Sequence, residues 1–435
     1  MTLKEHLRKN IVLAYPVVIG QLGHIMVSVA DTAMVGRVGV IPLAGATFAG
    51  TIYHLLMLFG IGMSYAVTPL VAATDPSKKS HLLSFLQNGV FLNTLFGLGL
   101  LIAGLIVVPF LGNFGQEPEV VIAARPYLII VLTSLVPLMV FQTFRQYAEG
   151  LSDTFNPMIV SIVANLLNVG LNYVLIFGKL GFPAYGLIGA GYATLISRIL
   201  MAILMIVMIR KTWTGIQFSI DRMIIKRMFK IGIPSGLQYV FEVGAFAMAA
   251  IMVGWISAEA LAAHQIALNL AAITYMAATG IAAASTIRIG NQMGLKDLPN
   301  LKIAGYSCFG LVAAFMAICG FMFIIFREPL AALYVKDEFV RNLAASLLVI
   351  AAAFQVSDGI QAVGLGVLRG LTDVKVPTLV TFFAYWVIAI PLGYVLGFTF
   401  EMGVSGIWYA LLTGLTLAGL LHIIRFQNKI RKLSF

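Results

Sequence analysis

Residues 150–157 read GLSDTFNP, and residues 370–377 read GLTDVKVP. The two segments lie in opposite halves of a chain of 435 residues, and each lies between long apolar stretches. Glycine at the end of one helix and proline near the start of the next are typical of a tight turn. We interpret both segments as turns between helices, and a gating role is the alternative. Their similarity raises the question of whether the chain is duplicated.

Further matches occur in the same order along both halves when Pro16 is aligned with Pro234. This Pro16/Pro234 alignment also pairs MVG at 34–36 with MVG at 252–254, Leu43-Ala44 with Leu261-Ala262, Gly62 with Gly280, and Thr68 with Thr286. Any single match is expected by chance. An ordered series without large gaps predicts an internal duplication.

The composition is that of a membrane protein. Hydrophobic residues make up 60% of the chain and charged residues 10%, and the mean hydropathy is +0.98. A soluble domain carries about 25% charged residues. Apolar stretches of about 20 residues or more recur along the whole length, which is enough for a helix to cross the hydrocarbon layer. The sequence therefore predicts a polytopic membrane protein.

The apolar stretches predict an all-α fold with twelve transmembrane helices. The expected spans are 11–36, 43–73, 84–112, 120–148, 156–178, 186–209, 228–255, 261–290, 301–326, 338–368, 376–398 and 404–425. Since the repeat covers six helices, the two halves have the same orientation and are expected to be related by a pseudo-two-fold axis along the membrane normal. We predict an N-terminal six-helix lobe at 1–210, a linker at 211–230 and a C-terminal six-helix lobe at 231–435.

The positive charges predict the orientation. The net charge is +11, and 21 Lys and Arg residues lie on the side of the termini against six on the opposite side. This asymmetry predicts that both termini are cytoplasmic, in a bacterial-type inner membrane. The linker carries a basic, amphipathic piece suited to the headgroups of the lipid bilayer. We attribute the charge to topology and expect no nucleic acid partner.

No signature of an enzyme or a resident cofactor is present. The sequence lacks an HExxH motif, a paired Asp motif and a Ser/Lys dyad at helical spacing. Cys308 and Cys319 lie on one apolar stretch, about 16 Å apart along a helix, and cannot form a disulfide within it. We therefore expect no catalytic residues.

Three acids lie inside predicted helices: Asp31, Glu242 and Asp358. A carboxylate in the middle of a bilayer costs about 3 kcal/mol on insertion scales, so an acid there is functional by default. Glu242 and Asp358 lie near the predicted midplane, and Asp31 lies nearer the outer face. The Pro16/Pro234 alignment pairs Glu242 with His24 and Asp31 with Ala249, so the two halves have different roles.

Other polar residues are predicted to lie at about the same depth in the membrane as Asp31. Asn165, Asn168 and Asn172 are spaced by three and four residues and share one helix face, and Thr194 reaches the same depth. A carboxylate among amides and hydroxyls is either a proton site or a site for a hard cation. The alternative for the asparagines is hydrogen bonding that only holds helices together.

The remaining polar residues within helices have other assignments. Arg198 is expected to neutralise an acid or a carbonyl, but the sequence does not identify which one. Gln265, within AAHQIALN, is a second polar group on an apolar helix and is a weaker candidate for ligand contact. The scattered His24, His54 and His264 lack metal-ligand spacing and are interpreted as structural.

At these residues the chain resembles the multidrug and toxic compound extrusion (MATE) family, in its NorM-type branch. The resemblance covers the full length and includes Asp31, FEVGAF around Glu242, AAHQIALN, NLLNVGLNYVLIFG and VSDGIQAVGLGVLRGLTD around Asp358. It implies export of cationic drugs and dyes in exchange for Na+ or H+, by a monomer without a cofactor. It also implies that Glu242 and Asp358 form the Na+ site, and that Asp31 with Asn168, Asn172 and Thr194 forms a site in the N-terminal lobe. Phe354 departs from this pattern because it lacks the hydroxyl group that some Na+ sites use. H+ therefore stays an alternative to Na+ as the coupling ion.

Two other functions fit parts of the pattern. A flippase for lipid-linked precursors on a related repeat fold would need a basic cavity, whereas Arg198 is the single basic residue at depth. The residue content does not exclude a channel, and a transport assay in vesicles distinguishes it from an exchanger.

Overall fold

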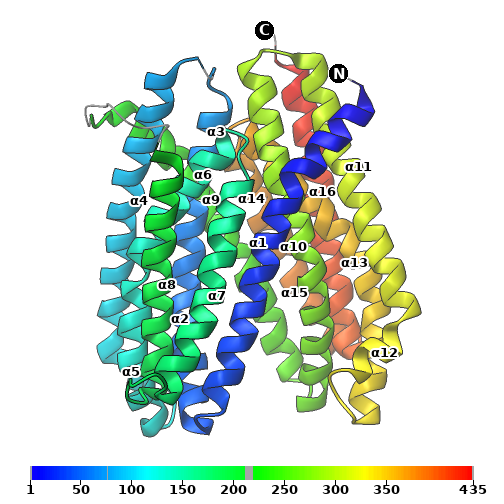
Figure 1. Ribbon diagram of the computed structural model, residues 1–435. Coiled ribbons are helices and arrows are strands. Elements are labelled where there is room, and N and C mark those ends of the chain that lie inside the picture. The colour runs from blue at the N-terminus through cyan, green and yellow to red at the C-terminus, as the bar shows by residue number, and fades with distance from the viewer. Residues whose placement is uncertain (1, 76, 211–218, 434–435) are drawn as a thin grey trace. The chain divides into compact units, whose positions relative to one another are not determined.

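The computed structural model describes residues 2–75, 77–210 and 219–433, and these residues form helices and turns without a strand. Twelve helical spans are long and apolar enough to cross a membrane, judged by length and composition. The predicted all-α class with twelve spans is therefore confirmed. Figure 1 shows the order of the helices along the chain.

The described residues of the first half form nine helical segments. They are α1 (Leu3–Gly36), α2 (Val40–Ser64), α3 (Val67–Ala72), α4 (Lys79–Val107), the 3-10 segment η1 (Val108–Phe114), α5 (Pro118–Thr133), α6 (Leu135–Gly150), α7 (Phe155–Phe177) and α8 (Gly186–Ile209). The second half contains α9 (Arg222–Gly254), α10 (Ala258–Gly294), α11 (Leu298–Ile325), α12 (Arg327–Ala332), α13 (Glu338–Gly370), α14 (Lys375–Phe382), the π-helical η3 (Phe383–Ala389), α15 (Ile390–Tyr394), the π-helical η4 (Val395–Thr399) and α16 (Gly403–Arg431).

The predicted linker differs from the structure at its second end. Residues 211–218 lie outside the described residues, so the predicted amphipathic piece is described only in part. Residues 222–230 form the first turns of α9 and continue directly into the apolar part of that helix. They are therefore not a separate helix.

Prolines explain several interruptions within the spans. Proline has no N–H and its ring clashes with the carbonyl four residues earlier, so it disrupts the preceding turn of a helix. The break between α2 and α3 lies four residues before Pro69, and the break at Ser134 between α5 and α6 lies three residues before Pro137. The π-helical η3 ends just before Pro391. Sequence patterns alone merge these pieces into single spans.

The chain packs into two compact units. We call Ile19–Gly236 the N-terminal unit, and Met1–Val18 together with Leu237–Phe435 the C-terminal unit. Each half of the chain thus gives the first part of its first helix to the other unit. α1 changes unit two residues after Pro16, and α9 does so two residues after Pro234. This division differs from the predicted one, which assigned each helix wholly to one lobe.

Close helix contacts repeat in the two units. In the N-terminal unit, a Cβ on Gly62 would lie 2.4 Å from the Cα of Gly236, so α2 and α9 are in backbone contact at these two glycines. In the C-terminal unit, a Cβ on Gly280 would lie 2.4 Å from a methyl group of Val18. The Pro16/Pro234 alignment pairs Gly62 with Gly280 and Val18 with Gly236. The repeated contacts support the predicted duplication.

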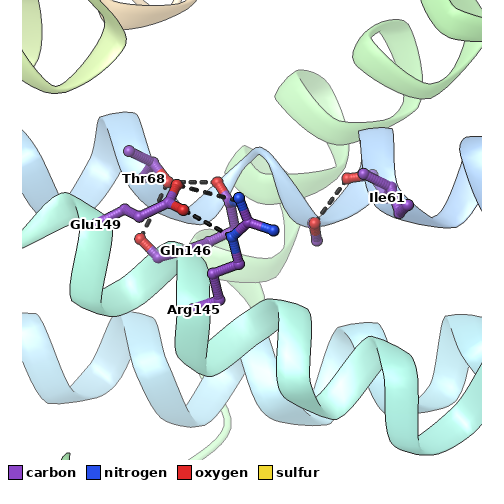
Figure 2. Close-up of polar contacts among 6 residues, drawn as sticks. Ile61, Thr68, Arg145, Gln146 and Glu149 are labelled. Carbon is purple, nitrogen blue, oxygen red and sulfur yellow. Dashed lines mark hydrogen bonds and ion pairs between the residues drawn. The ribbon is translucent and has the colours of Figure 1, made fainter. Parts of the chain in front are cut away.

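A threonine hydrogen bond also repeats. Thr68 Oγ1 donates to the carbonyl of Gln146 at 3.0 Å, and Thr286 Oγ1 donates to the carbonyl of Gly366 at 2.8 Å. Beside Thr68, Arg145 Nε donates to Glu149 Oε1 at 2.7 Å in a buried ion pair (Figure 2). Glu149 corresponds to Arg369 when the GLSDTFNP and GLTDVKVP segments are aligned. The threonine-to-carbonyl hydrogen bond is therefore repeated in the two units, whereas the Arg145–Glu149 ion pair beside it is not.

The GLSDTFNP and GLTDVKVP segments are tight turns, as predicted. Ser152 and Thr372 adopt left-handed backbone conformations with φ of 67° and 57°. The N–H groups of Asp153 and Asp373 each donate at 2.9 Å to the carbonyl five residues earlier, which ends the preceding helix. A β-branched residue at positive φ is uncommon, so the bonds around Thr372 hold it there.

Candidate cation sites

Polar residues line one face of α13 in the C-terminal unit. Gln355, Asp358 and Gln361 follow one another at intervals of three residues, so they lie on adjacent turns of one side of the helix. All three are buried. Because α13 packs against α10, α11 and α16, this face is enclosed by other helices of the same unit.

Glu242 on α9 lies at this polar face. Its side chain is 7% exposed, and its Oε1 accepts a hydrogen bond of 2.8 Å from the hydroxyl of Tyr275 on α10. Its Oε2 accepts a longer bond of 3.4 Å from Nε2 of Gln361. The structure therefore brings together α9, α10 and α13 around one carboxylate.

Asp358 is the second carboxylate of the site. It is 5% exposed, and no described residue donates a hydrogen bond to it. It is close enough to Glu242 for the two groups to interact electrostatically. Two buried carboxylates repel each other when both are ionised, so the arrangement favours a proton or another cation. The predicted pairing of Glu242 with Asp358 is consistent with this geometry.

Buried polar atoms without partners lie on the same elements. Among the described residues, Gln355 Nε2, Gln361 Oε1 and Tyr385 Oη have no hydrogen-bond partner. Buried polar groups are normally satisfied, so each exception needs an explanation. The free oxygens of Gln361 and Tyr385 are the kind of atoms that hard cations prefer. We name the polar residues that α9, α10, α13 and η3 bring together the acidic site. It consists of Glu242, Tyr275, Gln355, Asp358, Gln361 and Tyr385.

The π-helical segment η3 supplies Tyr385. Its ring is fully buried, and the hydroxyl interacts electrostatically with Glu242 and Asp358. The adjacent Trp386 donates through Nε1 to the carbonyl of Phe241 at 2.9 Å, which fastens η3 to α9. A π-helical turn shifts the register of the side chains, and such turns are frequent at functional sites.

Phe354 lies one turn before Asp358 and has a packing role. It is 2% exposed and contacts the rings of Phe246 and Trp408, with centroid separations of 6.0 and 5.5 Å. Trp408 in turn donates to His264 at 3.1 Å. The hydroxyl groups of the acidic site therefore come from Tyr275 and Tyr385, not from position 354.

The N-terminal unit brings Asp31 to the asparagines of α7. Asn172 Nδ2 donates to both Asp31 Oδ1 and Asn168 Oδ1, the latter at 3.0 Å. A Cβ on Gly23 would lie 2.9 Å from Asn165 Nδ2, so α1 and α7 approach closely at this glycine. The expected contact between Asp31, Asn168 and Asn172 is present.

Two other predicted members do not join this contact directly. The buried Nδ2 of Asn165 has no hydrogen-bond partner among the described residues. Thr194 Oγ1 donates to the carbonyl of Ala190 on its own helix at 3.1 Å. Asn165 is available to another group, whereas the hydroxyl hydrogen of Thr194 is already used within α8.

Arg198 on α8 has hydroxyl partners. Its Nη1 donates to the hydroxyl of Tyr53 and to Ser134 Oγ, the latter at 2.7 Å, and its guanidinium lies 5.0 Å from the centre of the Tyr53 ring. Asp31 and Arg198 interact electrostatically but form no ion pair within 4.0 Å. These contacts supply the partners that the sequence did not identify.

Gln265 was predicted as a candidate for ligand contact, whereas several residues of the acidic site were not predicted. Gln265 is exposed on α10, and no described residue forms a hydrogen bond with it. Sequence reasoning missed Tyr275, Gln361 and Tyr385. The spacing of Gln361 from Asp358 was a usable signal, whereas the role of Tyr385 depends on a π-helical register that the sequence pattern does not reveal.

Among the described residues, twelve apolar spans with the carboxylates Asp31, Glu242 and Asp358 inside them define a membrane transport protein rather than an enzyme. The MatE family model matches residues 16–174 and 234–395, and the two matched segments begin at the aligned Pro16 and Pro234. The chain therefore belongs to the MATE family of transporters. This confirms the family suggested by the sequence motifs.

Similar proteins extend over nearly the whole chain. The chain is 36% identical to a multidrug resistance protein NorM of Aliivibrio fischeri, over 97% of this chain and 94% of that protein. It is 33% identical to a multidrug resistance protein MdtK of Pectobacterium atrosepticum, over 97% and 95%. The spans and these bacterial relatives identify the chain as a multi-pass inner-membrane protein.

Solved structures share the fold. One, described as the outward-facing conformation of a multidrug resistance MATE family transporter of the MOP superfamily, matches with a TM-score of 0.87 at 18% identity, over 99% of this chain and 97% of that chain. The eukaryotic MATE transporter AtDTX14 matches with a TM-score of 0.87 at 18% identity, over 99% and 98%. At this identity the likeness concerns the fold alone.

Proposed function

We propose that this protein is a multidrug efflux antiporter that exports cationic amphipathic compounds in exchange for Na+ or H+. The observation that carries this proposal is the pair of buried carboxylates Glu242 and Asp358 at one polar face of α13, where Gln361 bonds to Glu242. The names of the relatives, multidrug resistance proteins NorM and MdtK, support drugs as the exported compounds.

Exchange requires a site that two cations do not occupy together. We assign this role to Glu242 and Asp358, with the unpartnered oxygens of Gln361 and Tyr385 completing the site for a cation. Tyr275 supports the carboxylate of Glu242 by its hydrogen bond. A coupling ion that neutralises the pair removes the attraction for a cationic substrate, and loss of the ion restores it. Each net charge that moves inward gains about 2.3 kcal/mol per 100 mV, whereas a one-for-one exchange of monovalent cations is driven by the chemical gradient of the coupling ion alone.

Asp31 forms a second polar site in the N-terminal unit. Asn172 and Asn168 support its carboxylate, and Asn165 retains an unpartnered amide group. We assign Asp31, the three asparagines and Thr194 to binding a substrate or coupling cation. The exposed Gln265 is a weaker candidate for substrate contact.

The orientation, boundaries and assembly state belong to the same proposal. The excess of Lys and Arg on one side supports cytoplasmic termini. We propose residues 1–210 and 231–435 as the two functional repeats, although the start of each repeat's first helix packs in the other compact unit. We propose that a monomer carries out transport, since each unit contains its own acidic residues. Fusion of a reporter to either terminus tests the orientation.

One experiment tests the function and identifies the ion. The purified protein is reconstituted in vesicles, and movement of ethidium, a cationic dye, is followed under a Na+ gradient alone and under a pH gradient alone. We expect one gradient to drive ethidium against its own gradient. Movement that only dissipates the ethidium gradient under both conditions would identify a channel and overturn the proposal.

A further inference from the structure

The first turns of α1 pack into the C-terminal unit through polar side chains that the exchange scheme does not use. His6 and Asn10 on α1 are fully buried, and Arg288 near the end of α10 is 4% exposed. Arg288 Nη2 lies 2.8 Å from His6 Nδ1, and Arg288 Nε donates to Asn10 Oδ1 at 3.3 Å. Asn10 Nδ2 donates in turn to Ser307 Oγ on α11 at 2.8 Å. Hydrogen bonds therefore join α1 to both α10 and α11.

Arg288 is a buried cation without an acidic partner. Among the described residues, no carboxylate lies within 4.0 Å of its guanidinium. Buried charges are normally paired, because the loss of hydration is costly. Its acceptors here are one imidazole nitrogen and one amide oxygen. The contact between α1 and α10 therefore depends on a lone pair supplied by His6.

The hydrogen bonds around His6 define its protonation state. Asp297, the N-cap of α11, accepts from Nδ2 and from the backbone N–H of Asn300, at 2.6 and 3.1 Å. These bonds hold the pKa of Asp297 below its ordinary value, so the carboxylate is ionised and only accepts. Because Nδ2 of Asn300 faces Asp297, its Oδ1 accepts from His6 Nε2 at 3.0 Å. His6 Nδ1 then accepts from Arg288, and the imidazole is neutral.

The equivalent contact in the N-terminal unit is apolar. A Cβ on Gly89 would lie 3.7 Å from Cε of Met228, so the first turns of α9 pack against α4. The Pro16/Pro234 alignment pairs His6 with Ile224, Asn10 with Met228, Arg288 with Leu70 and Ser307 with Gly89. Apolar packing is thus enough to hold this part of the repeat. The polar contact is a separate feature of the C-terminal unit.

We propose that His6 and Arg288 form a pH-sensitive latch, which releases the first turns of α1 from the C-terminal unit when His6 takes up a proton. An imidazolium carries a proton on both nitrogens, so it has no lone pair for Arg288. It also places two positive charges in contact at a buried position, where they repel each other. The latch is therefore closed at high pH and opens as the pH falls. Since α1 continues into the N-terminal unit after Val18, the latch acts on a helix that both units share.

The other charges that face His6 do not reverse this effect. Lys9 and the N-terminal amino group are positive and add to the repulsion. Asp297 attracts an imidazolium, but the amide of Asn300 lies between the two groups. Arg288, in contrast, is in direct contact with the ring. The repulsion from Arg288 therefore acts at the shorter distance.

The test is the distance between two spin labels within the C-terminal unit. One label replaces the exposed Lys4 on α1 and the other the exposed Ile318 on α11, in a full-length protein with Cys308→Ala and Cys319→Ala. We expect one narrow distance distribution at about pH 8 and a second population at about pH 5, since an imidazole changes its charge in this range. The readout involves no transport, so it is independent of the proposed exchange.

Two variants separate protonation from packing. His6→Gln offers an amide oxygen to Arg288 and an amide N–H to Asn300 but takes up no proton, so it is expected to stay closed at both pH values. Arg288→Gln removes the charge and can bond to either form of His6, and we expect the same result. His81→Gln, at an exposed histidine of α4, is the control and should keep the wild-type response. A wild-type distribution that is unchanged by pH, or a pH response that persists in His6→Gln, would overturn the inference.

Discussion

The hydroxyl of Tyr275 donates a 2.8 Å hydrogen bond to the carboxylate of Glu242, joining α10 to α9 inside the C-terminal unit. This contact stabilises the ionised carboxylate when no cation is bound, because a hydrogen bond to a charged group contributes about 1.5–3 kcal/mol. It therefore limits how strongly Glu242 attracts a coupling ion. A site that must also release its ion benefits from such a limit.

Tyr275→Phe is expected to lower the coupling-ion concentration that gives half the maximal transport rate. Loss of the hydrogen bond leaves the carboxylate more dependent on a cation, and about 1.4 kcal/mol corresponds to a tenfold change in affinity. The measurement is the ion dependence of ethidium transport in vesicles. Tyr409→Phe, at an exposed tyrosine of α16, is the matched control. A half-saturating concentration that stays unchanged or rises would contradict this role of Tyr275.

Tyr385→Phe is expected to stabilise the ion-free protein while weakening ion binding. The buried hydroxyl of Tyr385 has no hydrogen-bond partner among the described residues, and such a group costs about 1–3 kcal/mol. Thermal unfolding in detergent should show a higher Tm without the coupling ion and a smaller rise in Tm when the ion is added. If the ion raises the Tm of the variant and of the wild-type protein equally, Tyr385 is not a ligand.

The buried ion pair between Arg145 and Glu149 in Figure 2 is expected to show strong coupling between its partners. Arg145→Leu alone leaves a buried carboxylate without its cation and should cost about 3–5 kcal/mol. Arg145→Leu with Glu149→Leu should recover most of that loss, because both charges are removed. The check is a double-mutant cycle of unfolding free energies in detergent. Additive single effects would mean that the pair contributes no specific interaction.

Gly62→Ala is expected to disrupt the packing of α2 on α9 at Gly236. A Cβ at position 62 would lie 2.4 Å from the Cα of Gly236, and a backbone atom cannot move aside as a flexible side chain can. Yield and Tm in detergent should both fall. Gly99→Ala is the control, since no atom lies within 4 Å of the added Cβ there. Equal effects of the two substitutions would show that the close approach does not matter.

Much of the fold was predictable because the membrane imposes a simple rule on the sequence. Apolar stretches revealed all twelve spans to within several residues, and Pro16 and Pro234 revealed equivalent points in the duplicated halves. The exchange of the first segments of α1 and α9 between units was not predictable. Periodicity shows that a helix has an apolar face, but it does not show which neighbour covers that face.

The candidate sites were predictable to the extent that charge is rare in membrane helices. Asp31, Glu242 and Asp358 stand out for that reason, and the spacing of Asn168 and Asn172 indicated a shared face. Tyrosines are common at many positions in such helices, so the roles of Tyr275 and Tyr385 required the tertiary contacts. The partners of Arg198, Tyr53 on α2 and Ser134 between α5 and α6, are distant from it in sequence, and no local pattern connects them.

The central claim is that substrate and coupling ion compete for the carboxylates of the acidic site. The most direct measurement adds ethidium to the purified, ion-loaded protein and counts the Na+ or H+ released. We predict release of coupling ion by the wild-type protein and no release by Glu242→Gln combined with Asp358→Asn. Binding of ethidium to the wild-type protein without release of either ion would contradict the account.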